Sequence, residues 1–391
     1  MRRISIYYVS IKNRCRNSVG TILHSFGTSM FLQLLRRNYK RSTFMSLDLH
    51  TSVTRDLIVP FQMNNIDLER WTISASSHLF GEPNLRTAHI RGANWKKLDQ
   101  IAITRFLNRY HRALDRYSGY VVSYTFSFLQ IFESLKKPIL AINATRYESP
   151  YTLHKDQYDY LNNCIQELVV SNRLTIVSNN IGDRDYLNYF TGIESFYIPN
   201  LCNYVAKHSP QGLPWVIHSR NLELANMLAS NVRNAATQES VFPTGFEHED
   251  FAKYAGVILI PYNISTMRLF ELTTAGFPVR IPSDRLLKEW ASMPGVLSEL
   301  SWVQVLADSC PKWLLNTPAD PGWADFLDWW LERADWNNPF FFPNVTRFDS
   351  VEELNFPPKP FLMKDIELRN AQIKSEWEEL IALFLRTQCQ N

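Results

Sequence analysis

The stretch that decides the fold runs from Val257 to Ser283 and reads VILIPYNISTMRLFELTTAGFPVRIPS. It begins with a short apolar run, Val257 to Pro261, which is typical of a buried strand. A polar turn follows, and residues Arg268 to Ala275 then have the composition of a helix. Gly276 predicts the end of that helix, and Pro278 keeps the chain from continuing as one. The order strand, turn, helix, strand is that of a parallel α/β unit.

The same alternation of apolar runs and helical stretches extends over the chain from about residue 56 onward, which favours a parallel sheet with helices on its faces. The predicted strands are Leu57–Phe61, Gly119–Tyr124, Pro138–Asn143, Leu174–Ser178, Trp215–His218, Val257–Pro261, Pro278–Pro282 and Thr346–Phe348. The predicted helices are Leu98–Tyr117, Ser127–Leu135, Lys155–Ser171, Asp183–Tyr189, Leu222–Asn231 and Arg268–Ala275.

The length of the chain and a stretch rich in proline and glycine indicate two domains. A chain of 391 residues is long enough for two domains. The stretch Tyr197 to Pro214 is dense in proline and glycine, which predicts a hinge where the two halves meet. We therefore expect an α/β fold of two Rossmann-like domains that face a cleft, with an amphipathic C-terminal helix packing back on the body. The expected parts are a basic segment 1–44, a first domain 45–200, a linker 201–214, a second domain 215–364 and the helix 365–391.

Composition excludes several classes of protein. With 45% hydrophobic and 20% charged residues the chain is globular, and a net charge of +3 is too close to balance to favour nucleic acid as a partner. The five cysteines contain no CxxC pair, which favours a reducing compartment over a disulfide framework or a zinc site and predicts a cytoplasmic protein. These cysteines are Cys15, Cys164, Cys202, Cys310 and Cys389.

The first 44 residues are strongly basic and almost free of acidic residues. Their best apolar stretch, Val19 to Leu35, is too polar for a membrane-spanning helix. Three interpretations stay open: a transit-like presequence, a segment that contacts a membrane surface, and a strand (Ile4 to Ile11) with a helix of the first domain.

The turn before the central helix has the features of an anion site. Ser265 is a good N-cap, so the amides of Thr266, Met267 and Arg268 would point out of the helix start, where a diphosphate is attracted. Glu271 lies one turn beyond Arg268 on the same face, where ribose hydroxyls could bond to its carboxylate. The alternative is an ordinary surface ion pair between Arg268 and Glu271.

This stretch resembles the nucleotide-sugar loop of GT-B fold glycosyltransferases, both the retaining family with an E-x7-E motif and the exostosin-like pattern S-x-R-L-x-E followed by G-x-P-V. The matching residues are Ser265, Arg268, Leu269, Glu271, Gly276, Pro278 and Val279. Glu271 stands where the second glutamate of E-x7-E would stand, but Asn263 occupies the position eight residues before it. That departure leaves open whether the reaction retains or inverts the anomeric configuration.

The resemblance implies a set of donor contacts on the second domain. Ser265, Thr266 and Arg268 would meet the diphosphate and Glu271 the ribose, while the loop with Gly245 and Phe246 would read the base. Ser219 and Arg220, after the strand Trp215–His218, stand where the family often keeps a phosphate-binding basic residue, or they are an ordinary helix cap and its neighbour. The full predicted donor site is Ser219, Arg220, Gly245, Phe246, Asn263, Ser265, Thr266, Met267, Arg268 and Glu271.

On the acceptor side, residues that directly follow strands of the first domain are the candidates for chemistry, because clefts lie at the carboxyl ends of parallel strands. Glu148 is the predicted general base, with Asp183 and then His154 behind it; a solvated loop acid is the alternative for Glu148. The nine histidines show no metal-ligand spacing. The resemblance implies a fold type that does not need a metal site, so no metal or other cofactor is expected to be required.

The sequence thus predicts a glycosyltransferase of the hexosyl- or pentosyltransferase class. It would move a sugar from a nucleoside diphosphate sugar to a glycan or lipid-linked acceptor, with contact to a membrane surface through the basic N-terminus as an option. Two alternatives keep the fold: an inactive protein that binds a nucleotide or sugar, and a nucleotide-sugar epimerase.

Overall fold

Residues 42–197 supply the strands of a first sheet in the order β2-β1-β3-β4-β5-β6. The computed structural model describes residues 42–74, 90–246 and 248–388. The pairs β1–β3, β3–β4, β4–β5 and β5–β6 are parallel. The strands are β1 (Ser42–Asp48), β2 (Ile66–Thr72), β3 (Gly119–Ser123), β4 (Ile139–Asn143), β5 (Leu174–Ser178) and β6 (Phe196–Tyr197).

Every residue of β3 and β4 is buried, as expected for central strands of a parallel sheet with both faces covered. The helices of this first half are α3 (Thr51–Asp56), α4 (Ile58–Met63), α5 (Gln100–Leu114), α6 (Leu129–Phe132), α7 (Lys155–Val170) and α8 (Ile181–Thr191). Short 3₁₀ turns lie at η2 (Trp95–Lys97), η3 (Phe126–Phe128), η4 (Glu133–Leu135) and η5 (Tyr151–Leu153).

The second half carries a sheet in the order β11-β10-β9-β7-β8, parallel at every pairing. Its strands are β7 (Trp215–His218), β8 (Ala235–Thr237), β9 (Val257–Leu259), β10 (Val279–Pro282) and β11 (Val345–Phe348). Its helices are α9 (Leu222–Asn231), α10 (Gln238–Val241), α11 (His248–Phe251), α12 (Met267–Ala275), α13 (Asp284–Trp290), α14 (Trp302–Leu306) and α15 (Phe326–Leu331), with 3₁₀ turns η6 (Lys312–Leu314), η7 (Asp335–Asn337) and η8 (Glu352–Asn355).

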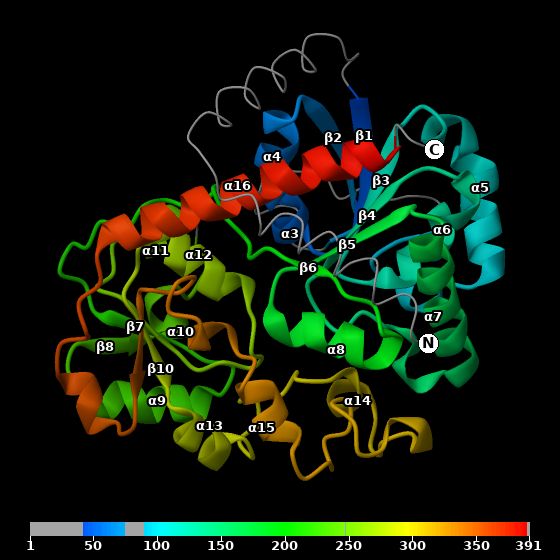
Figure 1. The fold of residues 1–391 in the computed structure, drawn as a ribbon. Helices are drawn as coiled ribbons and strands as arrows, with labels where there is room; N and C mark the ends of the chain where they lie inside the picture. The colour runs from blue at the N-terminus through cyan, green and yellow to red at the C-terminus, as the bar shows by residue number, and fades with distance from the viewer. Residues whose placement is uncertain (1–41, 75–89, 247, 389–391) are drawn as a thin grey trace, which may run out of the picture. The chain divides into compact units, whose positions relative to one another are not determined.

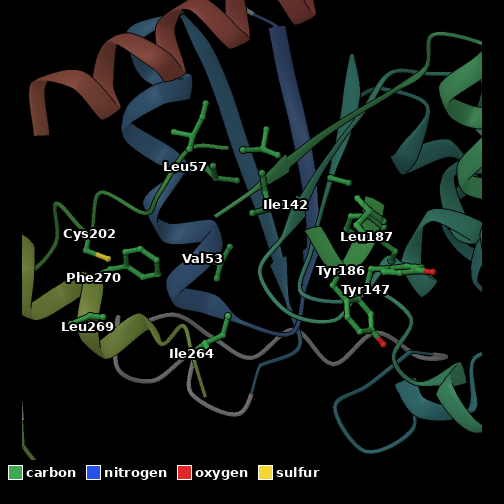
Figure 2. Packing of buried hydrophobic residues seen from close by; sticks show 14 of the residues in the cluster. Val53, Leu57, Ile142, Tyr147, Tyr186, Leu187, Cys202, Ile264, Leu269 and Phe270 are labelled. Carbon is green, nitrogen blue, oxygen red and sulfur yellow. The ribbon is translucent and has the colours of Figure 1, made fainter. Parts of the chain in front are cut away.

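The predicted fold class, two parallel α/β halves, is confirmed by these two sheets (Figure 1). The C-terminal helix α16 (Met363–Gln388) packs against α4 of the first half and α12 of the second, as predicted. Buried apolar residues from both halves form one cluster. Figure 2 shows part of it, with Val53 and Leu57 of the first half labelled together with Leu269 and Phe270 of α12.

One predicted strand is wrong: Leu57 caps α4, and residues 58–61 lie inside that helix. The run Leu-Ile-Val-Pro-Phe is apolar throughout, and such a short run cannot be told from a buried helix by periodicity. Pro60 is tolerated because it stands in the first turn, where its missing N–H costs nothing. The strand candidate Ile4–Ile11 lies outside the described residues.

The predicted linker is firmly held. The Asp56 carboxylate, at the end of α3, accepts hydrogen bonds from the backbone N–H groups of Leu201 (2.6 Å) and Cys202 (2.5 Å). Arg369 of α16 donates to the Asn200 carbonyl (2.8 Å) and to the Thr274 hydroxyl (2.9 Å). Residues 200–202 are therefore fixed by side chains from the first half and from α16, which argues against a loose connection at this point.

Candidate functional site

Both sheets have a point where the chain changes direction along the sheet. After β1 the chain adds β2 on one side and β3 on the other, and after β7 it adds β8 on one side and β9 on the other. A crevice opens at the carboxyl ends of the strands at such a switch point, and ligands of open α/β sheets bind there. The residues that directly follow β1, β7 and β9 are therefore the first candidates for a site.

A cavity of about 530 Å³ is lined by residues from these positions. Its volume lies within the range of pockets that enclose a small ligand. The lining residues are Leu49, His50, Thr51, Ser52 and Ser74 from the first half and His218, Arg220, Gly245, Phe246, Tyr262, Met267, Arg268 and Glu271 from the second.

The start of α12 enters the cavity through Met267 and Arg268. Its N-cap is Thr266, whose hydroxyl accepts from the Leu269 N–H (3.4 Å), so the predicted cap Ser265 is wrong by one residue. The Ser265 hydroxyl lies instead beside the buried Asp335 carboxyl, whose pKa burial raises well above its ordinary value. Gly276 ends the helix in the left-handed conformation (φ 80°), as the sequence predicts.

The Arg268 and Glu271 side chains form an ion pair (3.3 Å) that faces the cavity. The alternative predicts this pair, but the two side chains are only 18% and 9% exposed, so it is not an ordinary surface pair. Tyr204, from the linker, donates a hydrogen bond to the Glu271 carboxylate (3.0 Å), and the Arg268 guanidinium lies over the Phe246 ring at 4.9 Å from its centroid. Glu271 is thus held in one orientation and can only accept further hydrogen bonds.

The imidazole of His218, at the end of β7, lines the same cavity. Its Nδ1 lies 2.6 Å from the Gln238 Oε1 atom. Burial, assisted by the nearby Arg268 guanidinium, lowers the pKa of His218 to about 4. The ring is therefore uncharged at neutral pH.

A second guanidinium, that of Arg220, lies over the Tyr262 ring with 3.3 Å to its centroid and pairs with the Glu299 carboxylate. Arg220 and Arg268 give the cavity two cations, while Glu271 is its one acid among the described lining residues. Each guanidinium also has a carboxylate partner, Glu299 for Arg220 and Glu271 for Arg268, so the cavity offers an anionic ligand two groups of N–H donors, not a large net charge.

His50 brings an imidazole from the first half. It follows β1 by two residues and stands at the N-cap position of α3, where its side chain makes no capping bond. Burial lowers the pKa of His50, and the nearby Glu271 carboxylate opposes that shift. The Tyr124 ring packs against it with centroids 5.8 Å apart.

Tyr124 is itself unusual, because its backbone has φ 73° directly after β3. A bulky side chain in the left-handed region costs roughly 1 to 3 kcal/mol and persists where the surroundings enforce it. The ring also contacts Trp302 with centroids 6.2 Å apart, and the Trp302 Nε1 donates to the Arg146 carbonyl (2.8 Å). Tyr124 therefore keeps the His50 ring in place beside the cavity.

Six of the predicted site residues line the cavity and six do not. Those that line it are Arg220, Gly245, Phe246, Met267, Arg268 and Glu271, and those that do not are Glu148, Asp183, Ser219, Asn263, Ser265 and Thr266. The Ser219 hydroxyl accepts from the Asn221 N–H (3.0 Å), which fits the simpler interpretation as part of a helix start, and the true N-cap of α9 is Asn221.

Glu148 is fully buried, so its interpretation as a solvated loop acid is wrong. Its Oε1 accepts from the Tyr186 hydroxyl (2.9 Å) and the Thr152 hydroxyl (3.4 Å). Burial raises the pKa of Glu148 to about 7. Such a pKa suits proton transfer, but the carboxyl group does not line the cavity.

Asp183 belongs to a second buried cluster. Its carboxylate lies 3.5 Å from the Arg146 guanidinium, which also donates to the Asn263 amide oxygen (3.2 Å). Asn180 caps α8 by accepting from the Asp183 N–H (2.7 Å). Arg146 thereby links α8 of the first half to the turn after β9, which gives Asn263 a structural contact. His154, the third base candidate, is exposed at the start of α7.

Sequence reasoning missed the two cavity histidines, His50 and His218, because neither belongs to a recognisable spacing. His218 ends a strand that was predicted correctly, and its place at the carboxyl end of that strand could have marked it as a candidate site residue. His50 follows β1, whose residues were assigned to no predicted element, so nothing marked His50 as a candidate.

Within the described residues no helix is long and apolar enough to cross a membrane, and no group of three or more His, Cys, Asp or Glu side chains is arranged for a metal ion.

The chain has distant structural similarities. UGT73P12 of Glycyrrhiza uralensis, solved with glycyrrhetinic acid 3-O-monoglucuronide, is 11% identical over 90% of this chain and 97% of its own, with a TM-score of 0.41. The calicheamicin glycosyltransferase CalG4 is 9% identical over 88% and 98%, with a TM-score of 0.37. UDP-GlcNAc 2-epimerase from Neisseria meningitidis, bound to UDP-GlcNAc, is 11% identical over 63% and 83%, with a TM-score of 0.34. No protein-family model and no curated protein matches the chain.

Proposed function

We propose that this protein is a glycosyltransferase that moves a sugar from a nucleoside diphosphate sugar to a hydroxyl group of a glycan or lipid-linked acceptor. The observation that carries the proposal is the composition of the cavity wall. Cations and hydrogen-bond acceptors come from the second half, and an uncharged imidazole comes from the first half at the facing switch point.

The second half has the groups that a nucleoside diphosphate needs. Arg220, Arg268 and the first-turn amides of α12 suit the diphosphate, because guanidinium groups and free helix N–H groups both donate to phosphate oxygens. The Glu271 carboxylate suits hydroxyl groups, since it accepts hydrogen bonds only. Gly245 and Phe246 line the same wall and are placed to contact the base.

His50 is the proposed general base. Its lowered pKa keeps the imidazole unprotonated at neutral pH, as a base must be. In the proposed step His50 takes the proton of the acceptor hydroxyl, and the acceptor oxygen forms a bond to the anomeric carbon. The bond from that carbon to the diphosphate breaks at the same time and the nucleoside diphosphate leaves with the electron pair. Attack opposite the leaving group inverts the configuration.

This assignment replaces Glu148 and Asp183 as base candidates. Both carboxyl groups are buried in their own hydrogen-bonded clusters, and neither lines the cavity. His50 lines the cavity and is near enough to the Glu271 carboxylate for that charge to act on the pKa of the imidazole. Proximity to the acceptor oxygen is the first requirement for a base, ahead of its pKa.

Thermal unfolding with millimolar UDP, GDP, ADP and CMP tests donor binding. A ligand at 100 times its dissociation constant stabilises the folded state by about 2.7 kcal/mol. We expect one nucleoside diphosphate to raise the melting temperature of the wild type, the shift to be lost in Glu271→Ala, and the shift to persist in Glu289→Ala, which removes an exposed acid paired with Arg285. No shift with any nucleotide in the wild type overturns the proposal.

Incubation with the matching nucleotide sugar, with and without acceptors, then tests the reaction. Product that requires an acceptor supports transfer. Conversion of the donor into an isomeric nucleotide sugar without acceptor identifies an epimerase instead. Binding with neither product identifies a protein that has kept the site without turnover.

A further inference from the structure

The His218 imidazole is held by a hydrogen bond to Gln238, the residue that follows the neighbouring strand β8. β7 and β8 pair in parallel with Ile217 opposite Thr237, so the next residues, His218 and Gln238, lie side by side. Gln238 is also the first residue of α10, whose N-cap Thr237 accepts from the Ser240 N–H (3.2 Å). Sheet register and helix cap together hold the Gln238 side chain against the ring.

The hydrogen bond between the two side chains determines which ring nitrogen carries the proton. The Gln238 Oε1 atom can only accept, so Nδ1 of His218 must be the donor across their 2.6 Å contact. In an uncharged imidazole the other nitrogen, Nε2, then has a lone pair and no proton. Since His218 lines the cavity, Nε2 is the nitrogen available to a ligand.

The surroundings keep the ring in this state. The charged groups that act on it are the Arg268 and Arg220 guanidinium groups, and both oppose a positive charge on the imidazole. Burial acts in the same direction. An uncharged Nε2 lone pair does not attract phosphate oxygens, which are acceptors themselves. It accepts a hydrogen bond from a hydroxyl group.

We propose that Gln238 is a positioning residue that presents the Nε2 lone pair of His218 to the cavity, and that His218 accepts a hydrogen bond there from a hydroxyl group of the nucleotide-sugar ligand. The inference rests on the proposed function and adds a prediction of which ligands the site prefers. The site gains affinity from a sugar hydroxyl beside the diphosphate, and inorganic pyrophosphate, which has no such hydroxyl, gains nothing from His218.

The tautomer can be measured without any ligand. Two-dimensional ¹H–¹⁵N NMR of the histidine rings, compared between the wild type and His218→Phe, identifies the signals of His218. We expect a protonated Nδ1 and an unprotonated Nε2 from pH 6 to pH 8 in the wild type, and loss of this fixed tautomer in Gln238→Leu. A protonated Nε2 in the wild type overturns the proposal, because it would mean that the Gln238 amide is turned the other way.

Binding is measured by calorimetry with three ligands: the nucleotide sugar, the nucleoside diphosphate and pyrophosphate. We expect Gln238→Leu to weaken the nucleotide sugar about 5- to 10-fold, the effect of one hydrogen bond, with pyrophosphate unchanged. Equal weakening of both organic ligands places the hydroxyl on the ribose, and weakening of the nucleotide sugar alone places it on the transferred sugar. The matched control Gln166→Leu removes a similar amide bonded to the Thr191 carbonyl away from the cavity and leaves all three affinities unchanged.

Two outcomes separate this inference from the proposed function. If the wild type binds neither organic ligand, the proposed function fails, and the tautomer measurement still shows whether Gln238 fixes the ring. If the wild type binds both ligands and Gln238→Leu changes neither affinity, or weakens pyrophosphate as much as the nucleotide sugar, the inference alone is overturned.

Discussion

His50 is the residue on which the proposed chemistry depends most. Replacement by alanine removes the base while Arg268 and Glu271 stay in place to bind the donor. We expect His50→Ala to lower kcat by roughly 10²- to 10⁴-fold with little change in donor affinity. In the wild type, the rate should fall with acid only below pH 6.5, because burial lowers the pKa of His50 from that ordinary value.

Steady-state kinetics from pH 5 to pH 8 measure both effects. His154→Ala, which changes an exposed histidine at the start of α7, is the matched control and should keep full activity. A His50→Ala variant that keeps wild-type kcat would contradict the assignment and return attention to Glu148.

Glu148 gives a second prediction at this scale. Burial raises its pKa from 4.5 to about 7, so the folded state binds this proton more tightly than the unfolded chain does. The contribution of Glu148 to the free energy of unfolding therefore falls as pH rises from about 4.5 to about 7. Glutamine keeps an acceptor for the Tyr186 hydroxyl without the charge.

We expect Glu148→Gln to be close to neutral at pH 5 and to raise the free energy of unfolding at pH 8 by roughly 1 to 3 kcal/mol. Urea unfolding at the two pH values measures this difference. The same change in stability at both pH values would show that the carboxyl group does not titrate in this range.

At the scale of elements, the N-terminal turn of helix α12 places two side chains in the cavity wall. Its cap Thr266 fixes the first turn, from which Met267 and Arg268 reach the cavity. We expect Thr266→Ala to lower the free energy of unfolding by about 1 kcal/mol and Thr266→Ser to have a smaller effect, since serine keeps the hydroxyl. Urea unfolding checks the order, and equal losses in the two variants would mean that the threonine methyl group, not the cap, is responsible.

Elements with a clear apolar pattern were predictable, and strands interrupted by polar or charged residues were not. The helix Leu222–Asn231 and the strand Trp215–His218 were predicted with the observed bounds, because apolar residues and flanking turn residues agree there. Strand β2 (Ile66–Thr72) was missed because charged residues interrupt it at the edge of the sheet. β1 was missed because Ser42, Ser46 and Asp48 give it a polar character, although Ser46 and Asp48 are buried.

The part of the cavity wall in the second half was largely predictable, because Met267, Arg268 and Glu271 lie in one continuous stretch and Arg220 follows a predicted strand. The part in the first half was not, since it depends on which strands are neighbours. His50 faces the second half only because β1 lies at the switch point between β2 and β3, and a single sequence does not give that order. Glu148 and Asp183 follow strands as a base would, yet side-chain packing turns both away from the cavity.

For the whole molecule, Arg369 is the central connection. Its buried guanidinium donates to the carbonyls of Phe341 (2.9 Å) and Asn200 (2.8 Å), and the nearby Asp56 carboxylate favours its charge. Removal of this group leaves buried acceptors unpaired and a buried acid without its cation. We expect Arg369→Met to lower the free energy of unfolding by roughly 3 to 5 kcal/mol.

Arg386→Met is the matched control for this prediction, because Arg386 is an exposed arginine of the same helix that donates to the Ala382 carbonyl of that helix. We expect a change below about 0.5 kcal/mol for this surface variant. Thermal and urea unfolding of both variants decide the matter: similar losses would mean that helix propensity, not the buried connection, sets the effect.

The position of α16 also bears on how the protein is made. The Phe384 ring packs against Phe44 of β1 with centroids 5.8 Å apart, and α16 covers α4. Both β1 and α4 leave the ribosome long before α16 is translated, so the apolar surface that they present stays uncovered during most of synthesis. Nascent chains with such a surface are the ones that bind chaperones and aggregate when translation stalls. The strand β1 is therefore fully enclosed only after α16 has been synthesised.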